Sequence, residues 1–448
     1  MKRSHTGRPL SECPVFFMRI CHPSKILALF LAVSVIPIGA SRNIRASALS
    51  PLPFKPDIVV AQDSTGDFQN VQAAIDSIPK GNTERKVIYI MNGTYNEHIR
   101  LENSFVTLLG QDRPKTRIVW EINDLRKDPN ANADGKGIAS FNLHNANDVV
   151  IENLTIDNLA KLGAKPIVVF STGDGTRIVI QNADILGPGG DTLSLWTNGM
   201  YYHRNIHVTG TYHFVGPRGT CYMADSLLEC LASVSNALFN EGMQDERQKF
   251  VLHRCSIISK VPFGLGSNFR DAAWYFVDCQ FPDTLKPDGM IFVAQSNATK
   301  PQPASAMFKW ATDRVYFANS KGPAYPWLKD NIEKSPAKNA AEVTAAWTFS
   351  GKWDPESIVP PAVEAITRAD NIVSLKFSES MTVKGRPTIR LADGKTADYL
   401  AGSGTVTLTF KAASSAAAAT LHLNGGTILA SAASAQPRCI ADSLKLEK

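Results

Sequence analysis

VVIENLTIDN at residues 149–158 opens a series of short apolar segments that each turn on one polar residue. The series continues with IVIQNADILG (178–187), YYHRNIHVTG (201–210), CYMADSLLEC (221–230), FVLHRCSIIS (250–259) and WYFVDCQFPD (274–283). The turning residues are Asn153, Asn182, Asn205, Asp225, Arg254 and Asp278, spaced 20 to 29 residues apart. A strand–turn–strand unit repeated at such a period is typical of a solenoid, whose coils bury their apolar faces by stacking. The pattern therefore predicts an all-β chain built as a right-handed parallel β-helix. A β-sandwich is the alternative, although its hairpin turn dipeptides are largely missing here.

One short helix precedes this series. Val71, Ala74, Ile75 and Ile78 fall on one helical face, and Pro79 ends the pattern. We expect this helix to cover the first coil of the β-helix and so protect an exposed sheet edge.

The pattern changes to strict alternation of apolar and polar residues from Ile372 onward, with glycine-rich turns between the runs. This alternation predicts a small antiparallel β-sandwich over residues 365–448. The stretch FSESMTVKGRPTIRLADGKTADYLAGSGTVTLTF is similar to the immunoglobulin-like repeats appended to bacterial exported proteins. It contains no catalytic constellation, so a spacer or a surface-binding module is the expected role.

The N-terminus has the features of an export signal. The apolar run ILALFLAVSVIPIGA (26–40) follows Arg19 and Lys25, is too short to span a bilayer and is broken by Pro37. We expect cleavage after Ala48, with Ala40 as the competing site, so that residues 1–48 are a signal peptide and the protein is secreted or periplasmic. An uncut membrane anchor is the alternative.

The charge of the chain is concentrated in this leader. The 448 residues contain 47 Lys and Arg against 41 Asp and Glu, a formal net charge of +6. Residues 1–48 contain seven of these bases and one acid, which leaves 40 of each in the mature chain. A neutral mature chain argues against nucleic acid as a partner. Removal of the leader likewise leaves no segment for stable membrane insertion.

The mature chain keeps five cysteines, none of them at the pair spacing of a zinc site. Cys255 and Cys279 follow their turning residues in successive coils and should stack on each other. Either a disulfide or a pair of core thiols fits this arrangement.

Two residues one coil apart could perform acid/base chemistry. Asp191 lies in GGDTLSLW and His213 in GTYHFVGPRG, 22 residues further along. On one wall of a β-helix they would lie one strand spacing apart, roughly 5 Å. A carboxylate beside an imidazole forms a workable acid/base pair, whereas a turn aspartate and a surface histidine are the simpler interpretation of the spacing.

The chain resembles the pectinesterase (pectin methylesterase) family over residues 57–355. The resemblance runs in order through AQDSTGDFQNVQAAIDSIP, VIYIMNGTYNEHI, VTLLGQ, GDTLSLW, GTYHFVGPRG, FGLGSNFRDAAWYFVDC and WTFSGKWDP. It implies a pectin-lyase-type β-helix over these residues, a hydrolase for the methyl esters of pectin (polygalacturonate), and no cofactor. The implied partner is pectin or a related polyuronate, and the implied state is a monomer.

The resemblance transfers only part of the family's active site, which consists of two aspartates, an arginine and two glutamines. The acid/base aspartate falls on Asp191, which is retained, and the nucleophilic aspartate falls on His213. The arginine falls on Ser267, although Arg270 follows three residues later. The two glutamines fall on Lys165 and Gly190.

The expected catalytic residues are therefore Asp191, His213 and Arg270. Lys165 and Arg218 could supply positive charge to the substrate, and Phe214, Phe269 and Trp274 could stack on sugar rings. No metal site is expected. A polysaccharide-binding protein without catalysis is the alternative function, and another β-helix activity, such as a lyase or a glycoside hydrolase, is a third.

Overall fold

The computed structural model describes residues 55–122, 132–240, 247–268, 272–292 and 314–446. The predicted signal peptide, residues 1–48, lies outside the described residues. Nowhere in those ranges is there a helix long and apolar enough to cross a bilayer.

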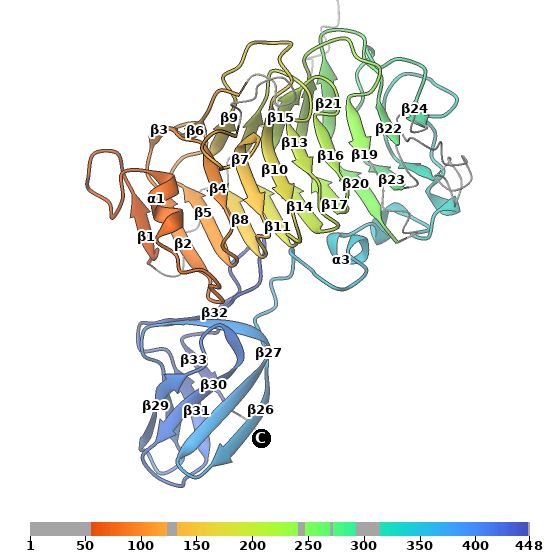
Figure 1. Ribbon diagram of the computed structural model, residues 1–448. Helices are drawn as coiled ribbons and strands as arrows, with labels where there is room; N and C mark the ends of the chain where they lie inside the picture. Colours follow the sequence, from red (N-terminus) through yellow and green to blue (C-terminus); the bar gives the residue numbers. More distant parts are fainter. Residues whose placement is uncertain (1–54, 123–131, 241–246, 269–271, 293–313, 447–448) are drawn as a thin grey trace, which may run out of the picture. The chain divides into compact units, whose positions relative to one another are not determined.

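Three parallel sheets formed by the described residues wind into a β-helix, with their strands stacked coil upon coil (Figure 1). We call them sheets A, B and C. Sheet A contains, in spatial order, β1 (Ile58–Val60), β2 (Lys86–Ile90), β5 (Val106–Gly110), β8 (Val149–Glu152), β11 (Ile178–Gln181), β14 (Met200–Arg204), β17 (Thr220–Ala224), β20 (Lys249–His253), β23 (Ala273–Val277) and β25 (Val315–Ala318). The predicted parallel β-helix is confirmed.

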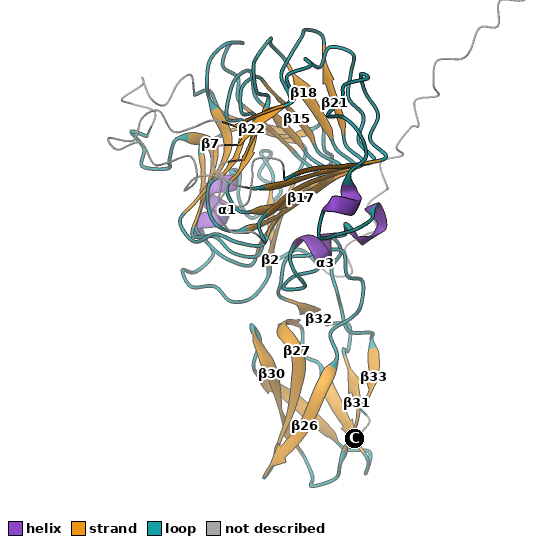
Figure 2. Cartoon of the chain, turned by 90° about the vertical axis from the view of Figure 1, so that its right-hand side faces the viewer, coloured by secondary structure: helices purple, strands orange, loops and turns teal. Residues whose placement is uncertain are grey.

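Sheets B and C form the other two walls (Figure 2). Sheet B contains β3 (Gly93–Asn96), β6 (Thr116–Val119), β9 (Thr155–Asp157), β12 (Asp184–Leu186), β15 (His207–Gly210), β18 (Leu227–Cys230) and β21 (Ser256–Ser259). Sheet C contains β4 (Ile99–Leu101), β7 (Ala139–His144), β10 (Ile167–Thr172), β13 (Leu193–Leu195), β16 (Val215–Pro217), β19 (Leu238–Asn240), β22 (Gly266–Asn268) and β24 (Met290–Phe292).

Each predicted turning residue follows a strand of sheet A and adopts a left-handed backbone conformation; the first five lead into a strand of sheet B, and Asp278 leads to Gln280, which forms an isolated parallel bridge with Ser256. Their φ angles lie between 49° and 58° at Asn153, Asn182, Asn205, Asp225, Arg254 and Asp278. Asparagine and aspartate adopt this conformation more readily than other residues with a side chain. The repeated polar residue is therefore the sharp corner of each coil.

The interior of the β-helix is filled by apolar side chains that point inward from all three sheets. Among the inward residues are Cys221, Cys255 and Cys279, which are buried free thiols. Of the two states considered for Cys255 and Cys279, the structure has the core thiols. The Cys255 thiol lies 3.4 Å from the Met223 carbonyl oxygen and the Cys279 thiol 3.3 Å from that of Leu252.

Helix α1 (Val71–Asp76) packs at the first coil, as predicted, with Val71, Ala74, Ile75 and Ile78 buried in the same core. The Glu97 carboxylate accepts hydrogen bonds of 2.8 Å from the backbone N–H groups of Val71 and Gln72. This carboxylate from the neighbouring coil satisfies the first donors of the helix.

Three short helical segments follow the last strand of sheet A: η1 (Ile332–Lys334), η2 (Ala340–Glu342) and α3 (Ala345–Thr348). They share an apolar cluster with Tyr202, Tyr222 and Tyr275 on the outer face of sheet A.

The C-terminal strands pair antiparallel in one sheet with a separate core; the antiparallel pairing is as predicted, and the sandwich over residues 365–448 stays a prediction. They are β26 (Val363–Ala369), β27 (Ile372–Lys384), β28 (Thr388–Leu391), β29 (Thr396–Ala401), β30 (Thr405–Ala412), β31 (Ala418–His422), β32 (Thr427–Ala430) and β33 (Ser443–Lys445). A register shift between Lys376 and Met381 lets β27 pair with β26 and β30 in its first half and with β32 in its second.

Candidate active site

Asp191 and His213, the acid/base pair that the sequence predicts, belong to the wall formed by sheet C. Val169, Leu193, Val215 and Leu238 stand in register across the sheet and are buried in the core. The next register row contains Phe170, Ser194, Gly216, Phe239 and Ser267. Because successive side chains on a strand point to opposite faces, this second row faces outward.

Asp191 and His213 lie two residues before β13 and β16, on neighbouring coils. Both have left-handed backbones, with φ of 59° and 52°. The backbone N–H of Asp191 donates a 3.0 Å hydrogen bond to the Tyr212 carbonyl oxygen, directly beside His213. The two residues therefore lie on one wall, on neighbouring coils; their pairing and their catalytic roles stay predictions.

The imidazole of His213 is held between two aromatic rings. The ring of Tyr212 stacks on the imidazole at a centroid distance of 3.7 Å, and the ring of Phe239 stacks on it at 4.1 Å. Tyr212 is 41% exposed, whereas His213 and Phe239 are half-buried. The histidine is therefore fixed in place at the surface of the site.

Two further polar residues reach His213, one of which the sequence analysis missed. Asn236, from the turn before β19, places its Nδ2 2.7 Å from His213 Nε2. Ser267, on which the sequence resemblance places an arginine of the family, has its Oγ 3.2 Å from the same nitrogen. The spacing contains a signal for Asn236, because it lies 23 residues after His213, one coil further along.

A second missed residue, Trp196, lies close to Arg218. The guanidinium carbon of Arg218 lies 4.1 Å from the centroid of the Trp196 ring, a cation–π contact. Phe170 packs edge-on against the same indole at 5.1 Å. Trp196, Tyr212 and Phe239 are thus the partly exposed aromatic residues near the predicted site.

The positions of the family's two glutamines lack a comparable amide donor. Lys165, at one of them, is exposed just before β10. Gly190, at the other, has room for no side chain, since a Cβ atom there would lie 2.8 Å from the Tyr212 carbonyl oxygen. Its backbone therefore approaches the neighbouring coil closely.

The prediction that Phe214 and Trp274 stack on sugar rings is wrong. Phe214 and Trp274 are both completely buried. Phe214 belongs to the β-helix core, and Trp274 packs there against Phe250 while its indole N–H donates to the Asn268 side chain. Alternation along the strand turns them inward, so neither ring is open to a ligand. Phe269 and Arg270 lie outside the described residues.

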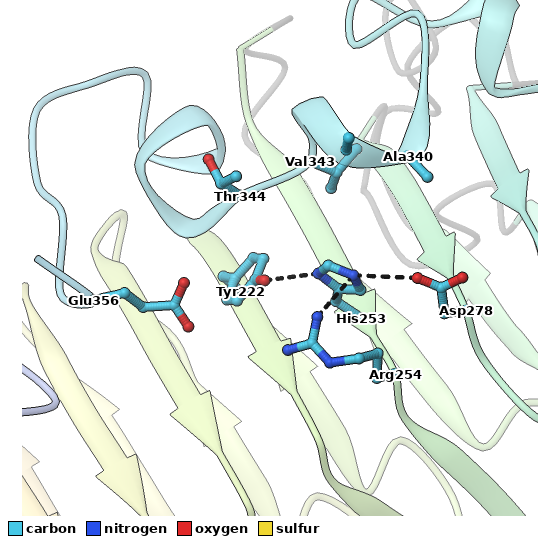
Figure 3. A pocket seen from close by; sticks show the side chains of 9 residues that line it. Tyr222, His253, Arg254, Asp278, Ala340, Val343, Thr344 and Glu356 are labelled. Carbon is cyan, nitrogen blue, oxygen red and sulfur yellow. Dashed lines mark hydrogen bonds and ion pairs between the residues drawn. The ribbon is translucent and has the colours of Figure 1, made fainter.

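A second polar cluster lines a cavity of about 380 Å³ on the outer face of sheet A (Figure 3). His253 Nδ1 lies 2.8 Å from the Tyr222 hydroxyl, and its Nε2 lies 2.9 Å from Arg254 and 3.4 Å from Asp278. Burial, together with the charge of Arg254, lowers the pKa of His253.

The charged groups of this cluster pair with one another. Arg254 also binds both oxygens of Asp225, and Glu356 accepts a 2.8 Å hydrogen bond from the Tyr202 hydroxyl. The network therefore ties the segment after α3 to sheet A. In the described ranges, no group of three or more His, Cys, Asp or Glu side chains could hold a metal ion.

Comparison with known proteins agrees with the resemblance. A family model described as Pectinesterase matches residues 57–266. Pectinesterase 31 of Arabidopsis thaliana is 27% identical over 205 residues, which cover 44% of this chain and 63% of that protein. A pectinesterase/pectinesterase inhibitor of Brassica campestris is 26% identical over 335 residues, which cover 68% of this chain and 54% of that protein. The chain thus spans less than two thirds of the length of either relative.

Solved structures share the fold. A pectin methylesterase in complex with a hexasaccharide superposes with a TM-score of 0.56 at 17% identity, covering 68% of this chain and 99% of that one. PemA of Erwinia chrysanthemi gives a TM-score of 0.54 at 17% identity, with coverage of 67% and 99%. At these identities the likeness concerns the fold alone.

Proposed function

We propose that the chain, which a family model described as Pectinesterase matches over residues 57–266, is an exported carbohydrate esterase that hydrolyses the methyl esters of pectin. The observation that carries the proposal is the placement of Asp191, the family's acid/base residue, beside His213 on the outer face of sheet C. The relatives named pectinesterase and the pectin methylesterase structure with a bound hexasaccharide support the choice of substrate.

Ester hydrolysis needs a nucleophile, a group that moves protons and a donor for the oxyanion. Asp191 serves as the acid/base group. His213, at the position of the family's nucleophile, either activates a water molecule or attacks the ester carbonyl carbon. In both cases the products are methanol and a free galacturonate carboxylate.

Positive charge for the polyuronate comes from side chains near this wall. Lys165 is exposed before β10, and Arg218 rests on Trp196 after β16. We include Arg270 as a third catalytic residue and Phe269 as a substrate-binding residue from the sequence resemblance. The apolar run and cleavage motif in residues 1–48 support export to the periplasm or the medium.

The test is methanol release from highly methylated pectin by the purified protein. The esterase releases methanol continuously and leaves a more acidic polymer. Absence of methanol at high enzyme concentration contradicts the proposal.

A non-catalytic pectin-binding protein is the second candidate. It is favoured because the resemblance places four of the family's five active-site residues on positions that hold other residues in this chain. Two of these replacements, His213 and Ser267, form hydrogen bonds with Asn236. This candidate predicts retention on immobilised oligogalacturonate without turnover, and methanol release contradicts it.

A further inference from the structure

The ring of His213 is fixed by contacts on both faces and through its own backbone. Tyr212 and Phe239 stack on it with interplanar angles of 26° and 20°. The His213 backbone N–H donates a 3.2 Å hydrogen bond to the Asn236 carbonyl oxygen. Reorienting this ring would break stacking contacts, which are worth about 0.5–1.5 kcal/mol each.

The contacts of Nε2 determine which ring nitrogen carries the proton. Asn236 Nδ2 lies 2.7 Å from His213 Nε2 and 2.7 Å from Ser267 Oγ, while the Ser235 hydroxyl donates to Asn236 Oδ1 at 2.7 Å. An amide nitrogen can only donate, so Nε2 must accept. A neutral imidazole that accepts through Nε2 carries its proton on Nδ1.

Burial reinforces this assignment. Asn236 is 3% exposed and Ser267 is fully buried, so neither side chain can satisfy its hydrogen bonds with bulk water. A proton on Nε2 would face the Asn236 amide donor at 2.7 Å, and Ser267 Oγ would be the one acceptor left to both donors among these three side chains.

We infer that Asn236 and Ser267 are positioning residues that hold His213 as the neutral Nδ1–H tautomer, so that it acts as a hydrogen-bond donor and not as the nucleophile. This inference rests on the proposed esterase function. Because Nε2 accepts from these two buried groups, Nδ1 carries the proton that the ring can donate.

The hydrolysis then proceeds without a covalent enzyme intermediate. Asp191 takes a proton from a water molecule, whose oxygen attacks the ester carbonyl carbon. The carbonyl oxygen becomes an oxyanion that accepts the Nδ1–H of His213. Collapse of this intermediate breaks the bond to the methoxy group, which takes the proton from Asp191 and leaves as methanol.

The experiment is ¹⁵N NMR of the histidine side chains in the purified protein, with His213 assigned by its loss in His213→Gln. We expect Nε2 of wild-type His213 to be unprotonated and Nδ1 protonated at neutral pH. Asn236→Asp places a carboxylate acceptor at Nε2, so the proton should move from Nδ1 to Nε2. The limb of the pH–kcat profile that reports His213 should then move to higher pH. Methanol release should fall at least tenfold.

Ser233→Ala, an exposed site in the same turn, is the control and should keep the wild-type spectrum and rate. A proton on Nε2 of the wild-type ring, or an unchanged tautomer in Asn236→Asp, overturns the positioning role. The spectrum is independent of turnover, so a wild type with the expected tautomer but no methanol release instead contradicts the esterase proposal and, with it, the donor role.

Discussion

At the scale of single residues, His203 combines complete burial with unsatisfied polar atoms. Its side chain points into the core from β14, and neither ring nitrogen has a hydrogen-bond partner in the described part of the chain. Burial lowers the pKa of His203 to about 3. The folded protein therefore contains the neutral ring over the whole physiological range.

This burial predicts acid sensitivity. Between pH 6.5 and 3 the unfolded chain binds a proton at His203 and the folded chain does not, so stability falls as pH falls. At pH 5 the loss is about 2 kcal/mol relative to pH 7. His203→Met should remove this part of the pH dependence, as measured by urea unfolding at both pH values.

The comparison isolates His203, because the other titrating groups are common to both proteins. Equal losses of stability between pH 7 and pH 5 in wild type and His203→Met would contradict the prediction.

Trp196 should contribute to substrate binding rather than to the chemical step. It supports Arg218 and is partly exposed on the outer face of sheet C. Trp196→Ala should raise KM about two- to tenfold, the equivalent of about 0.5–1.5 kcal/mol, with little change in kcat. Initial rates of methanol release over a range of pectin concentrations test this, and a selective loss of kcat would contradict it.

At the scale of elements, the corner between sheets A and B is the repeated unit of the fold. Asn205 has a φ of 51°, and its side-chain amide donates a 2.8 Å hydrogen bond to Asn182 on the neighbouring coil. Consecutive corners are thus linked by side chains as well as by the strands that follow them.

Asn205→Ala should destabilise the β-helix by about 2–3 kcal/mol, since alanine resists the left-handed conformation and loses the hydrogen bond. Asn205→Gly loses only the hydrogen bond and should cost about 1 kcal/mol. Denaturant midpoints measure both, and equal effects of the two substitutions would show that the backbone conformation is not the cause.

The corners explain why the β-helix could be predicted while parts of the site could not. Polar residues at a regular spacing report the coil period directly, and Asp191 and His213 follow that period. The sequence does not show which face Phe214 and Trp274 occupy, because all residues of β16 and β23 are buried and no alternation of polar and apolar residues marks the inward side. For Asn236 the coil spacing is the one signal in the sequence, because its turn, LASVSNALFN, contains no charged residue.

At the scale of the whole molecule, Arg85 connects residues that are distant in the sequence. Arg85 is 5% exposed. Its guanidinium donates two hydrogen bonds, of 2.9 and 2.7 Å, to the Ser431 carbonyl oxygen. It also donates to the Asp148 carbonyl oxygen at 2.7 Å and to the Thr107 hydroxyl at 2.9 Å. Although burial lowers its pKa to about 10, the guanidinium stays charged at pH 7.

Arg85→Met should weaken the attachment of the Ser431 segment by about 3 kcal/mol, because buried acceptors lose a charged donor. We expect faster proteolysis between β32 and β33 and a lower first unfolding temperature. Arg100→Met removes a surface ion pair with Glu102 and should change stability by less than about 1 kcal/mol. Equal protease resistance of Arg85→Met and wild type would contradict the prediction.

The account of the whole molecule rests on Asp191, the residue on which the resemblance places the acid/base aspartate of the pectinesterase family. Asp191 lies on the coil next to that of His213. Replacing its carboxylate by the isosteric amide removes the proton acceptor and leaves the shape of the site unchanged. Asp174→Asn, at an exposed turn after β10, is the matched control.

The most direct test is therefore the rate of methanol release from methylated pectin by wild type, Asp191→Asn and Asp174→Asn. The account predicts that wild type and Asp174→Asn release methanol at similar rates and that Asp191→Asn is about 10²- to 10⁴-fold slower, the usual contribution of a general acid/base. Release by Asp191→Asn at the wild-type rate, or no release by wild type, would contradict it.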